Sequence, residues 1–287
     1  MKLGPFDLHL ISDGYFRLDG GAMFGVIPKV LWNRTTECDE QNRIRLALNC
    51  LLVRTAEHNL LIDTGCGHKY TEKQIRIFGI EHPPDILSQL AARGLDPADI
   101  DIVINTHLHF DHCGGNTLIR AGEVIPTFPE ATYVVGRREF EEASHPNERT
   151  AATYLHHNWQ PVLAEGRMEL VDEDTEIVPG VTVIATPGHT LGHQSVRIET
   201  DGRVLLCIGD LCPTQAHVPL PWITAFDGYP MQTLESRRRI YRQAVDEKWN
   251  VFFGHDSEHP LGNLIEEEGR YKVRPLPWGD EVEGVQL

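Results

Sequence analysis

The sequence lacks several features that would place it in a specialised class of protein. None of its six cysteines forms a CxxC pair, and a chain of 287 residues can bury a core without disulfide staples. No apolar run approaches the length of a membrane span, and the first residues carry charges where a signal peptide needs an unbroken apolar core. We therefore expect a cytoplasmic protein with reduced thiols and no membrane partner.

Basic charge is also scarce. The chain has 26 lysine and arginine residues against 42 aspartate and glutamate residues, a formal net charge of −16. Such a surface repels phosphate backbones and anionic lipids, so no nucleic-acid partner is expected. The excess of acid could serve only to keep the protein soluble, and bound divalent cations would offset part of it.

Linkers and repeats are absent, so residues 1–287 are predicted to form a single domain. Apolar runs predict strands in both halves of the chain, and helical spacing predicts helices at 84–94 and 231–247. This order favours an α+β protein in which two packed sheets are covered by helices.

The stretch "NTHLHFDHCGG", residues 105–115, follows an apolar strand predicted at 100–105. Residues two apart in an extended segment project to the same side, so His107 and His109 are expected to face one point. The glycines at 114 and 115 are expected to force a tight turn that aims Asp111 and His112 at a neighbouring point. The alternative, surface histidines with ordinary hydrogen bonds, fits a lone histidine better than this spacing.

Three other strands end in a possible metal ligand directly after a glycine. "TPGHTLGH" places His189 after Gly188, "CIGD" places Asp210 after Gly209, and "FGHD" places His255 after Gly254. Each is weak alone, because such pairs are common turn sequences. Together they predict ligands that converge at one site.

The seven candidate ligands divide into two sets, with one residue shared between them. Imidazole nitrogens and carboxylate oxygens suit zinc, with iron, manganese and cobalt as alternatives. We expect two divalent metal ions, each with room for a shared water, as a catalytic site requires. One set is His107, His109 and His189, the other is Asp111, His112 and His255, and Asp210 bridges the two.

These motifs resemble those of the metallo-β-lactamase fold superfamily, and they extend over most of the chain. The resemblance implies a four-layer αββα sandwich with a dinuclear site at one edge of its sheets. His112 and Asp210 stand where true metallo-β-lactamases differ, which argues against antibiotic hydrolysis.

A closer resemblance is to the YtnP-type quorum-quenching lactonases. It involves "LDGGAMFGVIPKVLW", "THLHFDHCGG", "GDLCPTQAH" and "PWITAFDGYPM", and so includes segments outside the ligands. It implies hydrolysis of an N-acyl-homoserine lactone or a similar small lactone. Acyl-homoserine lactonases place a tyrosine three residues after the bridging aspartate, whereas this chain has Pro213. That departure concerns the substrate and not the metal chemistry.

Metal-bound histidines usually donate their second ring N–H to a carboxylate or carbonyl. Asp63, at the end of a predicted strand, is a candidate for such a contact, and a simple turn is the alternative. His193 is expected either to support the ligands or to pack a loop. The other histidines outside the proposed sites are interpreted as surface or packing residues.

Two apolar, turn-rich segments are candidates for substrate binding. They could grip an acyl chain beside the metals or form a homodimer contact, since exposed apolar patches serve either use. The residues concerned are Met23, Phe24, His217, Trp222 and Phe226.

The expected reaction is attack of a metal-bridging hydroxide on the lactone carbonyl, with Asp111 holding the hydroxide and passing its proton to the leaving oxygen. Two enzymatic alternatives use the same ligands: a phosphotriesterase or phosphodiesterase, and a glyoxalase II-like thioesterase. The thioesterase fits less well, because no basic, glycine-rich segment follows Asp210. A metal-dependent sensor without catalytic activity is the third alternative.

Overall fold

The computed structural model of the protein describes residues 1–279, and the chain forms two compact units. Unit 1 contains Met1–Gly4, Phe16–Ala47 and the chain from Glu173 onward, and unit 2 contains Pro5–Tyr15 and Leu48–Asp172. Each unit is assembled from separate stretches of sequence, so the single domain expected from the sequence stays a prediction.

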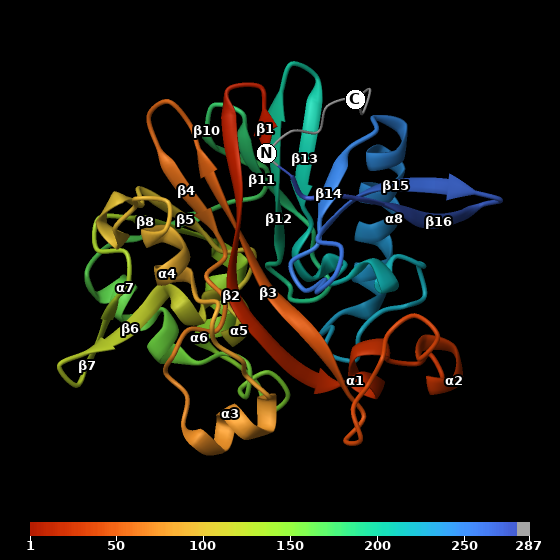
Figure 1. Ribbon diagram of the computed structural model, residues 1–287, viewed down its shortest axis with the longest axis horizontal. Coiled ribbons are helices and arrows are strands. Elements are labelled where there is room, and N and C mark those ends of the chain that lie inside the picture. The colour runs from red at the N-terminus through yellow and green to blue at the C-terminus, as the bar shows by residue number, and fades with distance from the viewer. Residues whose placement is uncertain (280–287) are drawn as a thin grey trace. The chain divides into compact units, whose positions relative to one another are not determined.

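One seven-stranded sheet has the order β1-β2-β3-β4-β5-β8-β9. All of these strands except β9 are labelled in Figure 1. Strands β3 and β4 pair antiparallel, whereas β4, β5, β8 and β9 are parallel neighbours. Parallel neighbours need long crossover connections, and these carry the helices of unit 2. The strands are β1 (Lys2–Leu3), β2 (Phe6–Asp19), β3 (Arg43–Arg54), β4 (Asn59–Ile62), β5 (Ile102–Ile104), β8 (Thr132–Gly136) and β9 (Met168–Val171).

The connections of unit 2 contain short helices and one separate hairpin, β6 (Thr117–Arg120) with β7 (Glu123–Pro126). The α-helices are α3 (Glu72–Phe78), α4 (Ile86–Ala91), α5 (Phe110–Cys113), α6 (Arg137–Ser144) and α7 (Gln160–Ala164). Single 3-10 turns are η1 (Pro97–Asp99), η2 (Gly114–Asn116) and η3 (His156–Asn158).

The core of unit 2 lies between the parallel strands and α4. Leu61 and Val103 of adjacent strands are fully buried with Leu90 of the helix. The helix predicted at 84–94 is shorter, because the Asp85 side chain accepts a hydrogen bond from the Ser88 N–H and so caps the helix one residue after Pro84.

The second sheet belongs to unit 1 and has the order β10-β11-β12-β13-β14-β15-β16. All neighbours are antiparallel except β13 and β14, which helix α8 connects. The strands are β10 (Thr175–Val178), β11 (Val181–Ala185), β12 (Gln194–Thr200), β13 (Arg203–Cys207), β14 (Asn250–Phe252), β15 (Leu261–Glu267) and β16 (Arg270–Leu276). Unit 1 also has α1 (Gly20–Phe24), α2 (Lys29–Trp32), α8 (Pro230–Asp246), η4 (Gly209–Leu211) and η5 (Gln215–His217).

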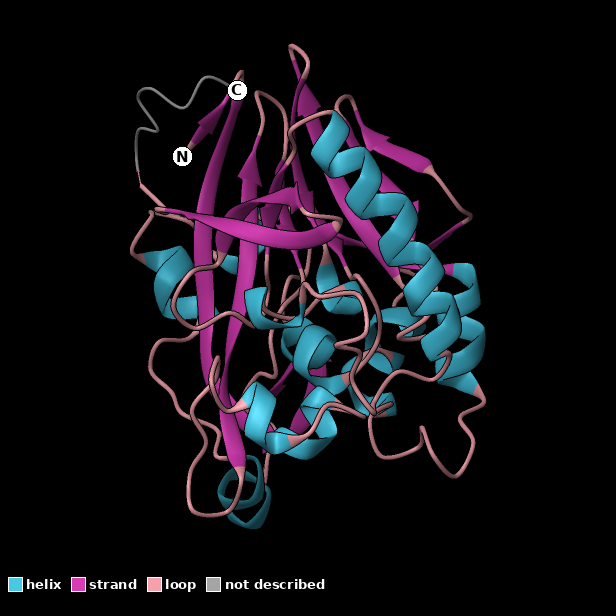
Figure 2. Ribbon diagram, turned by 90° about the vertical axis from the view of Figure 1, so that its right-hand side faces the viewer, coloured by secondary structure: helices cyan, strands magenta, loops and turns pink. Residues whose placement is uncertain are grey.

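Helix α8 is the long helix predicted near the C-terminus, and it lies against its sheet (Figure 2). Ile240, Tyr241 and Ala244 are fully buried and pack with Leu206 and Val251 of neighbouring strands. Such residues recur every three or four positions, so one stripe of the helix is removed from water.

The hairpin β15–β16 was missed from the sequence (Figure 1). Its turn residues are Glu268 and Gly269, both with positive φ, which is not one of the usual asparagine–glycine or aspartate–glycine signals. Charged and apolar residues alternate along β16, which is typical of a strand with one exposed face, so this signal was overlooked.

Within residues 1–279, none of the helices has the length and apolar character needed to cross a membrane.

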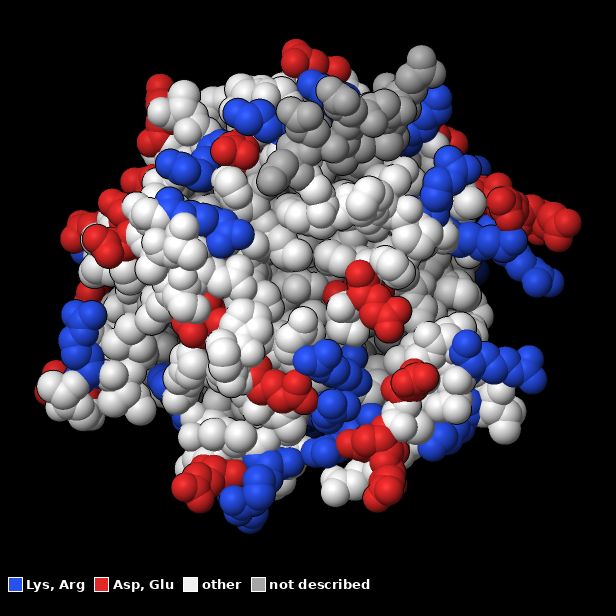
Figure 3. All heavy atoms as spheres, viewed as in Figure 1, with Lys and Arg blue, Asp and Glu red and all other residues white. Residues whose placement is uncertain are grey.

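Acidic and basic side chains are interspersed over the face drawn in Figure 3. The acidic excess of the sequence is therefore not gathered into one continuous patch on that face.

Candidate metal centre

In unit 2, the four ionisable residues of the 107–112 motif lie together after β5. All four are buried. The ring centroid of His107 lies 4.5 Å from that of His109 and 4.1 Å from that of His112. A ligand atom of Asp111 also lies within 4.8 Å of one of His112. These side chains are four of the seven predicted ligands.

The expected role of the glycines that follow was wrong. Asp111 and His112 lie in helix α5, before the glycines, and Gly114 has ordinary helical backbone angles. A Cβ at Gly114 would lie 2.1 Å from the Cys66 carbonyl oxygen, and one at Gly115 would lie 2.2 Å from that of Thr64. The two glycines therefore allow close packing of the chain after α5, and it is the helix that orients the ligands.

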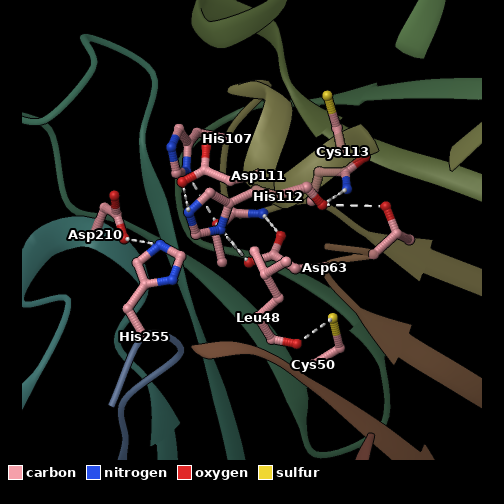
Figure 4. A network of polar contacts seen from close by, with 12 residues as sticks. Leu48, Cys50, Asp63, His107, Asp111, His112, Cys113, Asp210 and His255 are labelled. Atoms are coloured by element: carbon pink, nitrogen blue, oxygen red, sulfur yellow. Dashed lines mark hydrogen bonds and ion pairs between the residues drawn. The ribbon is translucent and has the colours of Figure 1, made fainter. Parts of the chain in front are cut away.

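Asp63 holds one of these ligands in place. Its Oδ2 lies 2.9 Å from His112 Nδ1, and the Thr106 backbone N–H and hydroxyl each donate to the carboxylate at 2.8 Å (Figure 4). Asp63 has φ +56°, in the left-handed region, directly after β4. Asp63 therefore contacts one candidate ligand, and its role in supporting a metal site stays a prediction.

Glu139, on helix α6, is a supporting residue that the sequence did not reveal. Its Oε1 accepts a hydrogen bond from the Leu108 N–H at 2.8 Å, between the two histidines of the motif, and another from the Tyr154 hydroxyl. In the sequence it is one of several glutamates on a polar helix, so only its burial distinguishes it.

In unit 1, His189, Asp210 and His255 come together from three different strand ends. Asp210 Oδ2 lies 3.3 Å from His189 Nε2. Asp210 Oδ1 lies 3.2 Å from His255 Nε2 (Figure 4). The carboxylate therefore turns one oxygen toward each imidazole. This is the arrangement needed of a residue that bridges two ions.

Asp227 supports His189 and was also missed. Its Oδ1 lies 3.1 Å from His189 Nδ1, and the hydroxyls of Thr224 and Thr233 donate to the carboxylate. Burial alone would raise the pKa of Asp227, but these hydrogen bonds and the neighbouring imidazole hold it below its ordinary value. The residue lies in "FDGYPM", a segment noted only for its family resemblance.

The other two candidate ligands of unit 1, His255 and Asp210, contact a carbonyl oxygen and a histidine ring. His255 Nδ1 lies 2.7 Å from the Ala47 carbonyl oxygen. The Asp210 backbone N–H donates to His193 Nε2 at 3.0 Å, and the other ring nitrogen of His193 contacts Thr186. His193 thus positions the backbone of Asp210.

These residues fit divalent metal ions. The Nδ1 atoms of His112, His189 and His255 each contact an oxygen, which directs the Nε2 atoms toward the carboxylates, as is usual for metal-bound histidines. Two ligands of one tetrahedral zinc ion, each about 2.1 Å from it, lie about 3.4 Å apart. The two Asp210–imidazole distances are close to that spacing.

Replacing Asp63 with asparagine is expected to weaken binding of one metal ion by about 10- to 100-fold. The neutral amide oxygen accepts a weaker hydrogen bond from the His112 ring N–H than the charged carboxylate does. Asparagine tolerates the left-handed backbone at this position, so the fold should persist. Competition with a chelator measures the affinity. An unchanged affinity would show that Asp63 only shapes the turn.

The residues predicted to bind substrate lie in two segments of unit 1 that pack on each other. Phe24 is fully buried and stacks on both His217, at 4.5 Å, and Trp32, at 5.0 Å. Met23 is also buried, Trp222 is half-buried, and Phe226 is 37% exposed. Their substrate contacts stay a prediction, and Phe226 is the one most open to a ligand.

His217 is buried and uncharged. Burial, with a further contribution from the positive charge of Arg237, lowers its pKa to about 3. Its ring contacts the Met23 carbonyl oxygen at 2.9 Å and the Thr214 hydroxyl at 2.7 Å. The ring therefore links the two apolar segments, and its burial keeps it neutral near neutral pH.

This burial predicts a pH dependence of stability. In the unfolded chain His217 takes up a proton near pH 6.5, whereas the folded chain does so only near pH 3. The free energy of unfolding should therefore fall as pH drops from 6.5 toward 3, by up to about 5 kcal/mol from this residue. Urea unfolding of His217→Gln at several pH values should show a shallower fall, and His145→Gln, at an exposed site, should follow the wild type.

Comparison with known proteins identifies a family and several relatives. Residues 44–255 match the Metallo-beta-lactamase superfamily. An N-acyl homoserine lactonase from Bacillus sp is 34% identical over 226 residues, 74% of this chain and 82% of the relative. The structure of a probable metal-dependent hydrolase from Staphylococcus aureus has a TM-score of 0.88 and 35% identity, covering 97% of this chain and 100% of that one. AidC, a dizinc quorum-quenching lactonase in complex with a product, shares the fold, with a TM-score of 0.80, 22% identity and coverage of 98% and 97%.

Proposed function

Because the chain belongs to the metallo-β-lactamase superfamily, we propose that it opens a lactone ring, with N-acyl-homoserine lactones as the substrate class. The predicted α+β fold of this superfamily is confirmed, and the protein is a metal-dependent hydrolase. The arrangement of Asp210 carries the finer proposal, because its two oxygens face two different imidazoles. The name of the Bacillus relative supports the choice of substrate.

The proposed centre holds two divalent ions, expected to be zinc, with iron, manganese or cobalt as alternatives. When bound, the two cations supply a nucleophile from water near neutral pH and an electrophile for a carbonyl oxygen. The ligand sets are those expected from the sequence: His107, His109 and His189 for one ion, Asp111, His112 and His255 for the other, and Asp210 shared between them.

Asp111 is the proposed catalytic residue. Its buried carboxylate lies at the start of α5 and contacts His112, with Oδ2 3.9 Å from the Nε2 atom. It accepts a proton from the attacking water and returns it to the ring oxygen as the ester C–O bond breaks. The product is the ring-opened hydroxy acid.

Phe226 is the proposed contact for the acyl chain. Replacing it with alanine is expected to raise KM for long-chain lactones about tenfold and to leave short-chain lactones nearly unchanged, because the lost apolar contact is worth about 1–2 kcal/mol. Kinetics with chains of graded length measure this. An unchanged preference together with a loss of dimers on gel filtration would instead favour the homodimer contact.

The proposal is tested with protein of measured metal content. N-acyl-homoserine lactones of graded length, a paraoxon-like phosphotriester and a glutathione thioester are assayed side by side. We expect the highest kcat/KM with a lactone. Absence of lactone turnover in protein carrying two ions would overturn the proposal, and turnover of the triester in that protein would identify a phosphotriesterase.

A further inference from the structure

Unit 2 contains a second group of side chains of the types that bind metal ions, away from the 107–112 motif in sequence. Asp13, on β2, and His68 and His82, in the connections on either side of α3, place ligand atoms within 4.8 Å of one another. The sequence suggested only packing or surface roles for these two histidines. Their association with a buried carboxylate is a product of the fold.

The carboxylate lies at the buried end of this group. Asp13 is 2% exposed, and its Oδ2 accepts a hydrogen bond from the Gly67 N–H at 2.7 Å. Gly65 approaches so closely that a Cβ there would lie 2.3 Å from the Asp13 Cβ. Burial raises the pKa of Asp13 to about 6. A cation held beside this buried carboxylate would offset the cost of removing its charge from water.

The histidines form the open end. Their ring centroids lie 4.1 Å apart, His68 is exposed and His82 is half-buried. The backbone of His82 is placed by the pairing of Glu81 with Tyr15, two residues from Asp13. An ion could therefore enter from solvent and meet two nitrogens before it reaches the carboxylate.

We propose that Asp13, His68 and His82 bind one divalent transition-metal ion, with zinc as the best match. Two imidazoles and one carboxylate are a preferred ligand set for zinc, cobalt and nickel, whereas calcium and magnesium require mostly oxygen ligands. Three protein ligands leave a position for water, which the exposure of His68 allows.

The ion would stabilise the segment that supports α5. Within residues 64–67, the Thr64 N–H donates to the His112 carbonyl oxygen at 2.7 Å, and a Cβ at Gly67 would lie 2.9 Å from the Gly114 carbonyl oxygen. The same segment donates to Asp13 through Gly67. His68 directly follows this segment, and Asp13 on β2 accepts a hydrogen bond from it, so an ion bound to both would restrain the backbone that contacts His112.

The test is a count of zinc bound per chain after metal removal, reloading with excess zinc and gel filtration. We expect His68→Ala and His82→Ala each to bind one equivalent fewer than the wild type, while exposed His145→Ala binds as many as the wild type. Zinc retained at the wild-type level in both His68→Ala and His82→Ala would overturn the proposal, leaving an ion pair of Asp13 with protonated histidine.

Two further measurements keep this result independent of the proposed hydrolytic centre. Adding His68→Ala to an Asp210→Ala background should still remove one equivalent, because the two groups share no ligand. His68 has no hydrogen bond that the fold depends on, so circular dichroism of His68→Ala should match that of the wild type. The melting temperature of the Asp210→Ala variant should rise with added zinc more than that of the Asp210→Ala, His68→Ala double variant. An equal rise in the two variants would also overturn the proposed site.

Discussion

Replacing Asp210 with alanine is expected to lower kcat/KM for a lactone about 10,000-fold. The carboxylate faces both His189 and His255, so its loss removes a ligand from each of two ions at once. Several kcal/mol of transition-state stabilisation depend on such ions, and about 5.5 kcal/mol corresponds to this factor. Steady-state kinetics with metal analysis measure both effects, and metal content should fall with activity.

Two variants define the result for Asp210. Asp210→Asn keeps the shape and one oxygen, so it should retain more metal than the alanine variant. Asp246→Ala, at an exposed position of α8, should behave as the wild type. Full metal content with wild-type kcat/KM in Asp210→Ala would contradict the bridging role.

Replacing Asp111 with alanine is expected to lower kcat for a lactone about 1,000-fold when metal is saturating. General acid–base catalysis contributes about 10²- to 10⁴-fold, and the departing ring oxygen of a lactone is a poor leaving group that needs a proton. An aryl ester, whose leaving group does not need one, should lose only about tenfold. Comparison of the two substrates separates proton transfer from metal binding.

The fold provides the control for Asp111. Its substitution should change the free energy of unfolding far less than it changes kcat, because the helix ends and the packing of the chain after α5 remain. Near-normal lactone turnover in a metal-replete Asp111→Ala variant would refute its catalytic role. Equal losses for lactone and aryl ester would assign Asp111 to metal binding alone.

The ligand motif was readable from the sequence because its geometry is local. His107, His109, Asp111 and His112 lie within six residues of one another, so the chain itself brings them together once β5 ends. The single-residue signals at His189, Asp210 and His255 were readable for a similar reason, since each follows a strand and a glycine. The family resemblance added that residues at such strand ends bind two metal ions.

The supporting residues were harder to predict because their partners are distant in sequence. Asp227 reaches His189 across 38 residues and Glu139 reaches Leu108 across 31, and neither carries a local pattern that distinguishes it from a surface acid. The hairpin β15–β16 was missed because its glutamate–glycine turn is not one of the usual hairpin signals, although charged and apolar residues alternate along β16 as in a strand. Gly114 was misread because close packing, unlike a turn, leaves no sign in the neighbouring residues.

The sequence by itself therefore determined the chemistry available to this protein: which donors follow which strands, and which superfamily uses them. Only the tertiary structure decided which carboxylates hold the histidines, which glycines permit close packing, and that Asp13 meets two histidines from distant connections. The physical reason is the sequence separation over which each kind of interaction acts. Backbone periodicity and turn preferences act over a few residues, whereas hydrogen bonds and steric fit act between any groups that the fold brings together.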